Sequence, residues 1–160
     1  MAAPYTKQQI RLHWIIFLLI AFQFLAHEPI SEAWSQIQRE GSAEFHPLVF
    51  THVAVGVLIL ILVLLRIGLR LRYGAPPLPE EESPAMQMVA KVTHLGLYVL
   101  MLGLPASGLA AWFGGASAAA EAHEVMKVIV LVLVGLHVAG ALYHQFVLKT
   151  NIMARMKRPG

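Results

Sequence analysis

Four long apolar stretches divide the chain, and polar segments separate them. They cover residues 10–26, 48–69, 85–113 and 122–148. Each is close to the ~20 residues that an α-helix needs to cross the hydrocarbon core of a bilayer. Helices are expected rather than open strands, because strands in lipid would leave backbone groups without hydrogen bonds. The pattern predicts an all-α integral membrane four-helix bundle, with residues 1–160 forming one domain.

The third stretch has a marked beginning and an interruption. Ser83 can cap the helix and Pro84 suits its first turn. Pro105 has no amide hydrogen, so the carbonyl of Met101 loses its helical partner and a kink is expected. The connecting segments are expected to be a polar, acidic segment over 28–47, a basic and then proline-rich segment over 70–83, and a short turn over 114–120.

The composition supports lipid as the solvent of this chain. Hydrophobic residues make up 58% and charged residues 13%, so a soluble fold could not cover its apolar surface with polar groups. The formal charge is +3, but the basic residues stand at the ends of apolar runs rather than in a stripe. Nucleic acid is therefore not an expected partner.

The lysines and arginines predict the orientation. With the N-terminus inside, ten of the twelve lie on the cytoplasmic side, and only Arg39 and Lys127 lie outside. This asymmetry predicts that both termini are cytoplasmic. Lys7 and Arg11 precede the first stretch as they would in a signal peptide, but no clear Ala-x-Ala site follows. We expect this helix to be retained.

Histidine is the chemically informative residue type. The chain has eight histidines and no cysteine, which excludes disulfides, thiolate-bound iron-sulfur clusters and covalently attached c-type haem. Ionisable side chains at membrane depth are costly and indicate function by default. A single histidine inside a bundle can also be a plain hydrogen-bonding residue.

The fourth stretch carries His123, His137 and His144 at separations of fourteen and seven residues. These are whole heptads, so the three histidines share one face, with Val130 at the vacant step. His123 and His137 are ~21 Å apart along the helix axis, which places one near each membrane face.

Each of these two histidines finds a partner at its own depth. His52 lies one turn into the second helix from outside, and His13 lies about one turn into the first helix from the cytoplasm. Two histidine pairs at two depths suit two six-coordinate b haems, whereas a metalloenzyme site would usually add carboxylates. The predicted pairs are His52 with His123 and His13 with His137.

Other histidines compete for these roles. His94 is the alternative candidate for the inner ligand. It could otherwise contact a haem propionate or a quinone, or simply form a polar bridge. His27 is the alternative candidate for the outer ligand, although its position at the end of a span predicts that it is solvated. His46, beside Pro47, is expected to be solvated as well. Several glycines would open the bundle for flat macrocycles or simply allow close helix packing: Gly56, Gly103, Gly108, Gly135 and Gly140.

Two further residues are candidates for catalysis. Lys127 follows His123 by four residues and shares its face, so it could attract an anionic reductant or simply snorkel to the interface. His144 lies ~10 Å beyond His137. It could bond a quinone carbonyl or move its proton, or contact headgroups or a haem propionate. Three arginines, Arg66, Arg70 and Arg72, are expected to fix topology, with propionate pairing as a second option.

Several segments together resemble the bacterial cytochrome b561 family over almost the whole chain. They are residues 9–14 (Gln-Ile-Arg-Leu-His-Trp), residues 51–56 (Thr-His-Val-Ala-Val-Gly), His94 with Leu104, Pro105 and Gly108, and residues 135–137 (Gly-Leu-His) through His144. The order of these motifs and the fourteen-residue spacing from His123 to His137 make the similarity specific.

The resemblance implies a four-helix, di-haem protein of the bacterial inner membrane whose axial ligands are His13, His52, His123 and His137. It also implies oxidation of superoxide on the periplasmic side, with electrons passing through both haems to ubiquinone. Other relatives act as haem-containing anchors that take electrons from a separate dehydrogenase. A haem-free, histidine-rich transporter of protons or metal ions is the remaining alternative.

Overall fold

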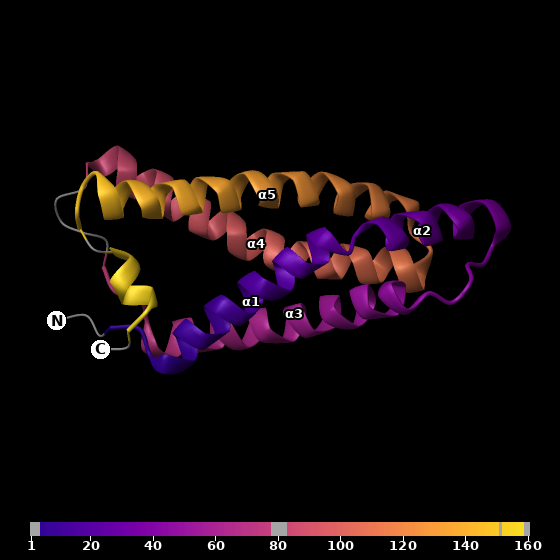
Figure 1. Cartoon of the computed structure of the whole chain (residues 1–160), viewed down its shortest axis with the longest axis horizontal. Coiled ribbons are helices and arrows are strands. Elements are labelled where there is room, and N and C mark those ends of the chain that lie inside the picture. Colours follow the sequence, from indigo (N-terminus) through magenta and orange to yellow (C-terminus); the bar gives the residue numbers. More distant parts are fainter. Residues whose placement is uncertain (1–3, 78–82, 151, 159–160) are drawn as a thin grey trace.

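A computed structural model describes residues 4–77, 83–150 and 152–158, which form helices and no strand (Figure 1). The helices are α1 (Lys7–Leu25), α2 (Glu28–Glu40), α3 (Pro47–Tyr73), α4 (Pro84–Gly114), α5 (Ser117–Phe146) and the short 3-10 helix η1 (Ile152–Met156). Four of them, α1, α3, α4 and α5, are long and apolar enough to cross a membrane. The predicted all-α class and four spans are confirmed. The outermost residues of the predicted domain, 1–3 and 159–160, lie outside the described residues.

The spanning helices begin and end where local chemistry favours it. Thr6 and Gln9 form a capping box that starts α1, and the Ser83 side chain accepts a hydrogen bond from the Met86 amide at the start of α4, as predicted. α5 begins at residue 117 rather than at 122, because the alanines that follow favour helix. The predicted turn over 114–120 is thereby reduced to two residues between α4 and α5.

The polar, acidic connection expected over 28–47 contains a further helix, α2. Pro29 stands in the first turn of α2, and Gly41 ends it with a left-handed φ of 77°. Glu28 in the first turn and Arg39 in the last complement the helix dipole. α2 packs against α3 at the end of the bundle away from the chain termini (Figure 1).

The bundle has a small core and an apolar exterior. α1 packs on α3, α3 on α4, and α4 on α5; Ile16, Ile59 and Val63 form the buried centre. Val130 is also buried, as expected for the vacant step of the histidine face. Outside, Leu18 is 63% exposed and many other large apolar side chains are similarly uncovered. Such a surface is suited to lipid contact.

Both ends of the described chain lie at one end of the bundle (Figure 1). Trp14 Nε1 donates a hydrogen bond to the Met156 carbonyl at 2.9 Å, and Arg155 donates to the Pro77 carbonyl at 2.8 Å. These contacts hold η1 against α1 and the α3–α4 connection. We call this the terminal end and the opposite end, where α2 lies, the far end. Assigning the terminal end to the cytoplasm remains a prediction from the charges.

Candidate functional site

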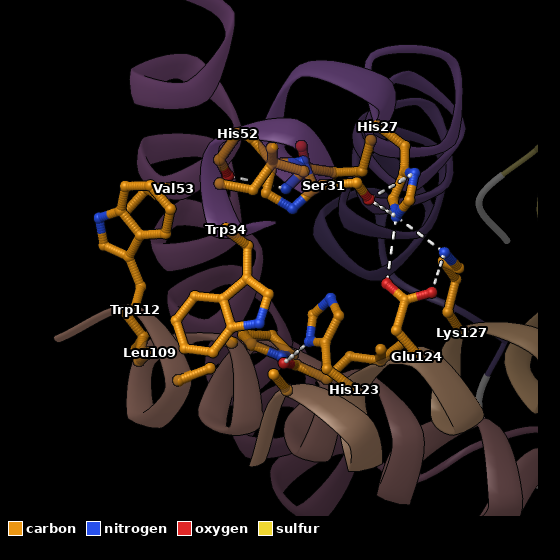
Figure 2. Close-up of a pocket in the computed structure, with 18 of the residues that line it drawn as sticks. His27, Ser31, Trp34, His52, Val53, Leu109, Trp112, His123, Glu124 and Lys127 are labelled. Carbon is orange, nitrogen blue, oxygen red and sulfur yellow. Dashed lines mark hydrogen bonds and ion pairs between the residues drawn. The ribbon is translucent and has the colours of Figure 1, made fainter. Parts of the chain in front are cut away.

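A cavity of about 440 Å³ lies inside the far end of the bundle (Figure 2). Its volume falls within the roughly 300–1,000 Å³ of typical ligand pockets. His52 from α3 and His123 from α5 line it, and Figure 2 shows them on opposite walls. The cavity is therefore lined by both histidines that the sequence predicts as the outer pair.

The ring of His123 is held in a defined orientation. Its Nδ1 donates to the Leu104 carbonyl at 2.9 Å, and the hydroxyl of Ser107 lies 3.2 Å from the same nitrogen. A hydrogen on Nδ1 leaves the lone pair on Nε2, which is how metal-binding histidines are commonly fixed. His123 is thus preorganised to bind a metal through Nε2.

His52 has the complementary feature of an unused nitrogen. Its Nδ1 is buried and has no hydrogen-bond partner among the described residues. Leaving such a group unsatisfied costs about 1–3 kcal/mol. The main chain of the same residue is held from α1, where Gln23 Nε2 donates to the His52 carbonyl at 2.9 Å. His52 therefore brings a buried imidazole to the cavity whose Nδ1 no described side chain satisfies.

One of the predicted glycines makes room for the His123 ring. A Cβ atom on Gly108 would stand 3.2 Å from Cε1 of His123, which is tighter than an ordinary contact. Gly103 instead lies against the sulfur of Met126, so it serves helix packing, while a Cβ on Gly135 or Gly140 would meet nothing within 4 Å. Among the glycines of the described residues, Gly108 alone would bring a Cβ within 4 Å of a histidine that the sequence predicts as a haem ligand.

His27, which was expected to be solvated, is partly exposed, with 24% of its side chain accessible, and also lines the cavity. Its Nε2 lies 2.7 Å from Nζ of Lys127 and 3.3 Å from a carboxylate oxygen of Glu124, and the ring also contacts the Ser31 hydroxyl (Figure 2). α2 begins directly after His27 and turns this ring toward the bundle. Lys127 lies at the cavity, as its shared face with His123 predicts, but it also forms an ion pair with Glu124.

His46 is exposed, as expected, and caps α3 by accepting a hydrogen bond from the Leu48 amide.

Three histidines meet nearer the terminal end. The ring centre of His137 lies 6.1 Å from that of His13 and 5.1 Å from that of His94. An imidazole nitrogen binds a metal at about 2 Å, so two imidazoles on opposite sides of one iron have centres about 6 Å apart. The His13–His137 separation fits this requirement, and the His94 separation is shorter. His94 also bonds the carbonyl of Ala90 in its own helix.

The arginines near this end contact other residues of the protein. Arg66 donates to the Gln9 carbonyl at 2.7 Å, and the guanidinium of Arg70 lies 5.6 Å from the ring centre of Tyr98.

His144 is buried further along α5, with its Nδ1 3.2 Å from the hydroxyl of Thr150.

The histidines present fit the binding of b haem. The far-end cavity combines a suitable volume with facing imidazoles, one preorganised and one unsatisfied, and the second pair has the spacing that an iron between two imidazoles needs. The absence of cysteine requires non-covalent attachment.

Sequence reasoning missed the part that α2 plays in the site. Trp34 points into the cavity from α2 (Figure 2), and Ile30 lines it as well. The signal was present: Ile30, Ala33, Trp34 and Ile37 recur at helical spacing on one face between a proline and a glycine.

Comparison with known proteins agrees with this arrangement. The family model of prokaryotic cytochrome b561 matches residues 5–159. Cytochrome b562 of Cereibacter sphaeroides is 36% identical over 157 residues, covering 97% of this chain and 96% of that protein. The probable superoxide oxidase CybB of Yersinia pestis is 32% identical over 180 aligned positions, covering 98% and 97%. Cytochrome b561 homolog 1 of Escherichia coli (strain K12) is 29% identical over 174 positions, covering 95% and 96%.

A match across nearly the whole chain, on a bundle that brings two pairs of histidines together, shows that this protein belongs to the prokaryotic cytochrome b561 family of membrane electron-transfer proteins that carry haem b.

Proposed function

We propose that the protein is a di-haem superoxide:ubiquinone oxidoreductase of the bacterial inner membrane. His52 and His123 would hold one b haem at the far end, and His13 and His137 a second toward the terminal end. The observation that carries the proposal is the pairing of imidazoles from different helices at two levels of one bundle. Bound haem supplies one-electron transfer, and an iron with two histidine ligands has no free position for oxygen.

The stoichiometry follows from the substrates. Each superoxide gives up one electron and becomes dioxygen, whereas ubiquinone takes two electrons and two protons. Two superoxide anions, one ubiquinone and two protons therefore give two dioxygen molecules and one ubiquinol. With the far end in the periplasm and the terminal end in the cytoplasm, as the charge distribution predicts, superoxide is oxidised outside and quinone is reduced near the inner face.

Lys127 is the proposed attractor of the anion at the far end. Its ammonium group lines the cavity that holds His52 and His123, and a positive charge beside a low-dielectric cavity raises the local concentration of anions. Glu124 offsets part of this charge through its ion pair with Lys127. The name of the Yersinia pestis relative, a probable superoxide oxidase, supports this choice of substrate.

His144 is the proposed proton carrier for ubiquinone. It is buried near the terminal end on the same helix as His137, and the hydroxyl of Thr150 lies 3.2 Å from its Nδ1. An imidazole can both bond a quinone carbonyl and pass a proton to it near neutral pH. The lipid bilayer would deliver the apolar quinone directly to this level of the bundle.

A second candidate function is a haem-containing anchor that takes electrons from a partner dehydrogenase. The pairing of Lys127 with Glu124 favours it, because it reduces the net attraction for a small anion. The haem-free transporter alternative does not agree with the family to which the chain belongs.

Stopped-flow mixing of the purified protein with superoxide separates these functions. We expect rapid reduction of the haem absorption bands, with ubiquinone converted to ubiquinol when it is supplied. A protein that is reduced by ubiquinol but not by superoxide would instead be the anchor for a partner dehydrogenase.

A further inference from the structure

Two residues that line the far-end cavity, Gln23 and His52, each carry a buried polar atom that is unsatisfied. Nδ1 of His52 and Oε1 of Gln23 are both buried, and neither has a hydrogen-bond partner among the described residues. Their hydrogen-bonding characters are opposite. An amide oxygen only accepts, and the Nδ1 of a neutral imidazole donates when its Nε2 carries the lone pair.

These two side chains belong to residues that are already in contact. Gln23 Nε2 donates to the His52 carbonyl at 2.9 Å, so the amide of Gln23 is anchored beside residue 52. Gly56 follows one turn later on α3, and a Cβ there would come within 3.6 Å of the same nitrogen. Gly56 therefore lies beside the amide of Gln23.

The His123 ring shows what His52 lacks. His123 donates its Nδ1 hydrogen to the Leu104 carbonyl, which leaves the lone pair on Nε2. Metal-binding histidines almost always donate their second nitrogen in this way. The Nδ1 of His52 has no such acceptor among the described residues. The Oε1 of Gln23 is an acceptor without a donor there, and it belongs to a residue that already contacts residue 52.

We propose that Gln23 is the positioning residue of His52, its Oε1 accepting a hydrogen bond from Nδ1–H when the ring binds haem iron through Nε2. The inference rests on the proposed role of His52 as a ligand. One amide then holds residue 52 through both its carbonyl and its ring.

This hydrogen bond has an electronic consequence that packing alone does not have. An acceptor on Nδ1–H makes the imidazole a stronger donor to iron, which stabilises the ferric state and lowers the reduction potential. Removing the acceptor should therefore raise the potential, whereas a carboxylate in its place should lower it. The opposite signs separate a hydrogen-bonding role from a space-filling one.

The test uses the full-length protein loaded with haem. Gln23→Leu should raise the potential of the far-end haem and weaken its binding about tenfold to hundredfold, the usual cost of losing such a partner. Gln23→Glu should lower the potential and shift the low-spin ferric EPR signal. Gln145→Leu is the matched control, because Gln145 is another glutamine with a buried, unpartnered Oε1 but does not line the cavity; it should leave the far-end haem unchanged.

His52→Ala identifies the far-end haem in the redox titration and tests the underlying assignment separately. If His52→Ala loses one haem while both Gln23 variants keep the parent potential and EPR signal, the role of Gln23 is refuted and the ligand assignment stands. Shifts of the same sign in Gln23→Leu and Gln23→Glu would also refute it, because they would indicate packing only. If His52→Ala keeps both haems, the ligand assignment of the proposed function is itself wrong. Should Gln23→Leu not fold, the near-isosteric Gln23→Glu decides by the sign of its potential shift.

Discussion

His94 packs its imidazole against that of His137, with ring centres 5.1 Å apart. This is closer than the 6.1 Å between His13 and His137, yet an iron between two imidazoles requires about 6 Å. We therefore expect His94→Ala to keep both haems, because its ring borders the site without binding iron. Haem counting by the pyridine haemochrome method checks this.

The matched variant is His13→Ala, which should lose one haem. Loss of a haem from His94→Ala together with two haems in His13→Ala would exchange the two roles and make His94 the ligand.

Charge at the far-end cavity should control the reaction with superoxide. Lys127→Glu should slow haem reduction by superoxide severalfold and weaken its dependence on ionic strength, because it replaces the attracting charge with a repelling one. The haem spectrum and reduction by ubiquinol should not change. Stopped-flow traces over a salt series measure both effects.

Glu124→Gln provides the opposite test of the same ion pair. It leaves the ammonium group of Lys127 without its carboxylate partner, so superoxide should react faster than with the parent protein. Equal rates in the parent and both variants would remove this pair from the path of the substrate.

Gly108→Ala should impair the far-end haem. The new Cβ would stand 3.2 Å from Cε1 and 3.3 Å from Nδ1 of His123, so the ring must shift from the orientation set by Leu104. We expect weaker haem binding and a changed EPR signal. Gly68→Ala is the control, since its Cβ would meet nothing within 4 Å and alanine favours helix by about 0.5–1 kcal/mol. If both variants bind haem like the parent, the close approach at Gly108 has no part in the site.

His144→Ala should slow the reduction of ubiquinone while leaving both haems in place. Proton transfer by a positioned side chain contributes about 10²–10⁴-fold to a rate, so a loss near hundredfold is expected in steady-state quinone reduction. Haem reduction by superoxide should keep its rate. Thr150→Val, which removes the hydroxyl beside Nδ1, should have a smaller effect in the same direction. Normal quinone turnover in His144→Ala would exclude His144 as the proton carrier.

The sequence predicts the spans and the histidine levels well, because both depend on strong local periodicities. A long apolar run in lipid is expected to form a helix, because the bilayer offers its backbone groups no hydrogen-bond partners. The heptad spacing places His123 and His137 on one face of their helix. The proximity of His13 to His137 then follows from matching depths, and the structure agrees with it. The same depth argument could not rank His13 above His94, because it contains no information about the distance between rings.

The far-end surroundings of the site were harder to predict. α2 is polar on one face, so its composition is that of a loop although its apolar residues recur at helical spacing. The positions of His27 and Trp34 both depend on this helix. Likewise, the contact between Gln23 and His52 joins residues far apart in the chain, and no local pattern encodes it.

The haem content of purified protein tests the central claim, that histidine pairs on different helices hold two b haems, most directly. A pyridine haemochrome assay should give two haems per chain in the parent protein and one in His137→Ala, because this substitution removes one ligand of the pair nearer the terminal end. Two haems retained in His137→Ala, or no b-type haem in the parent, would contradict the account.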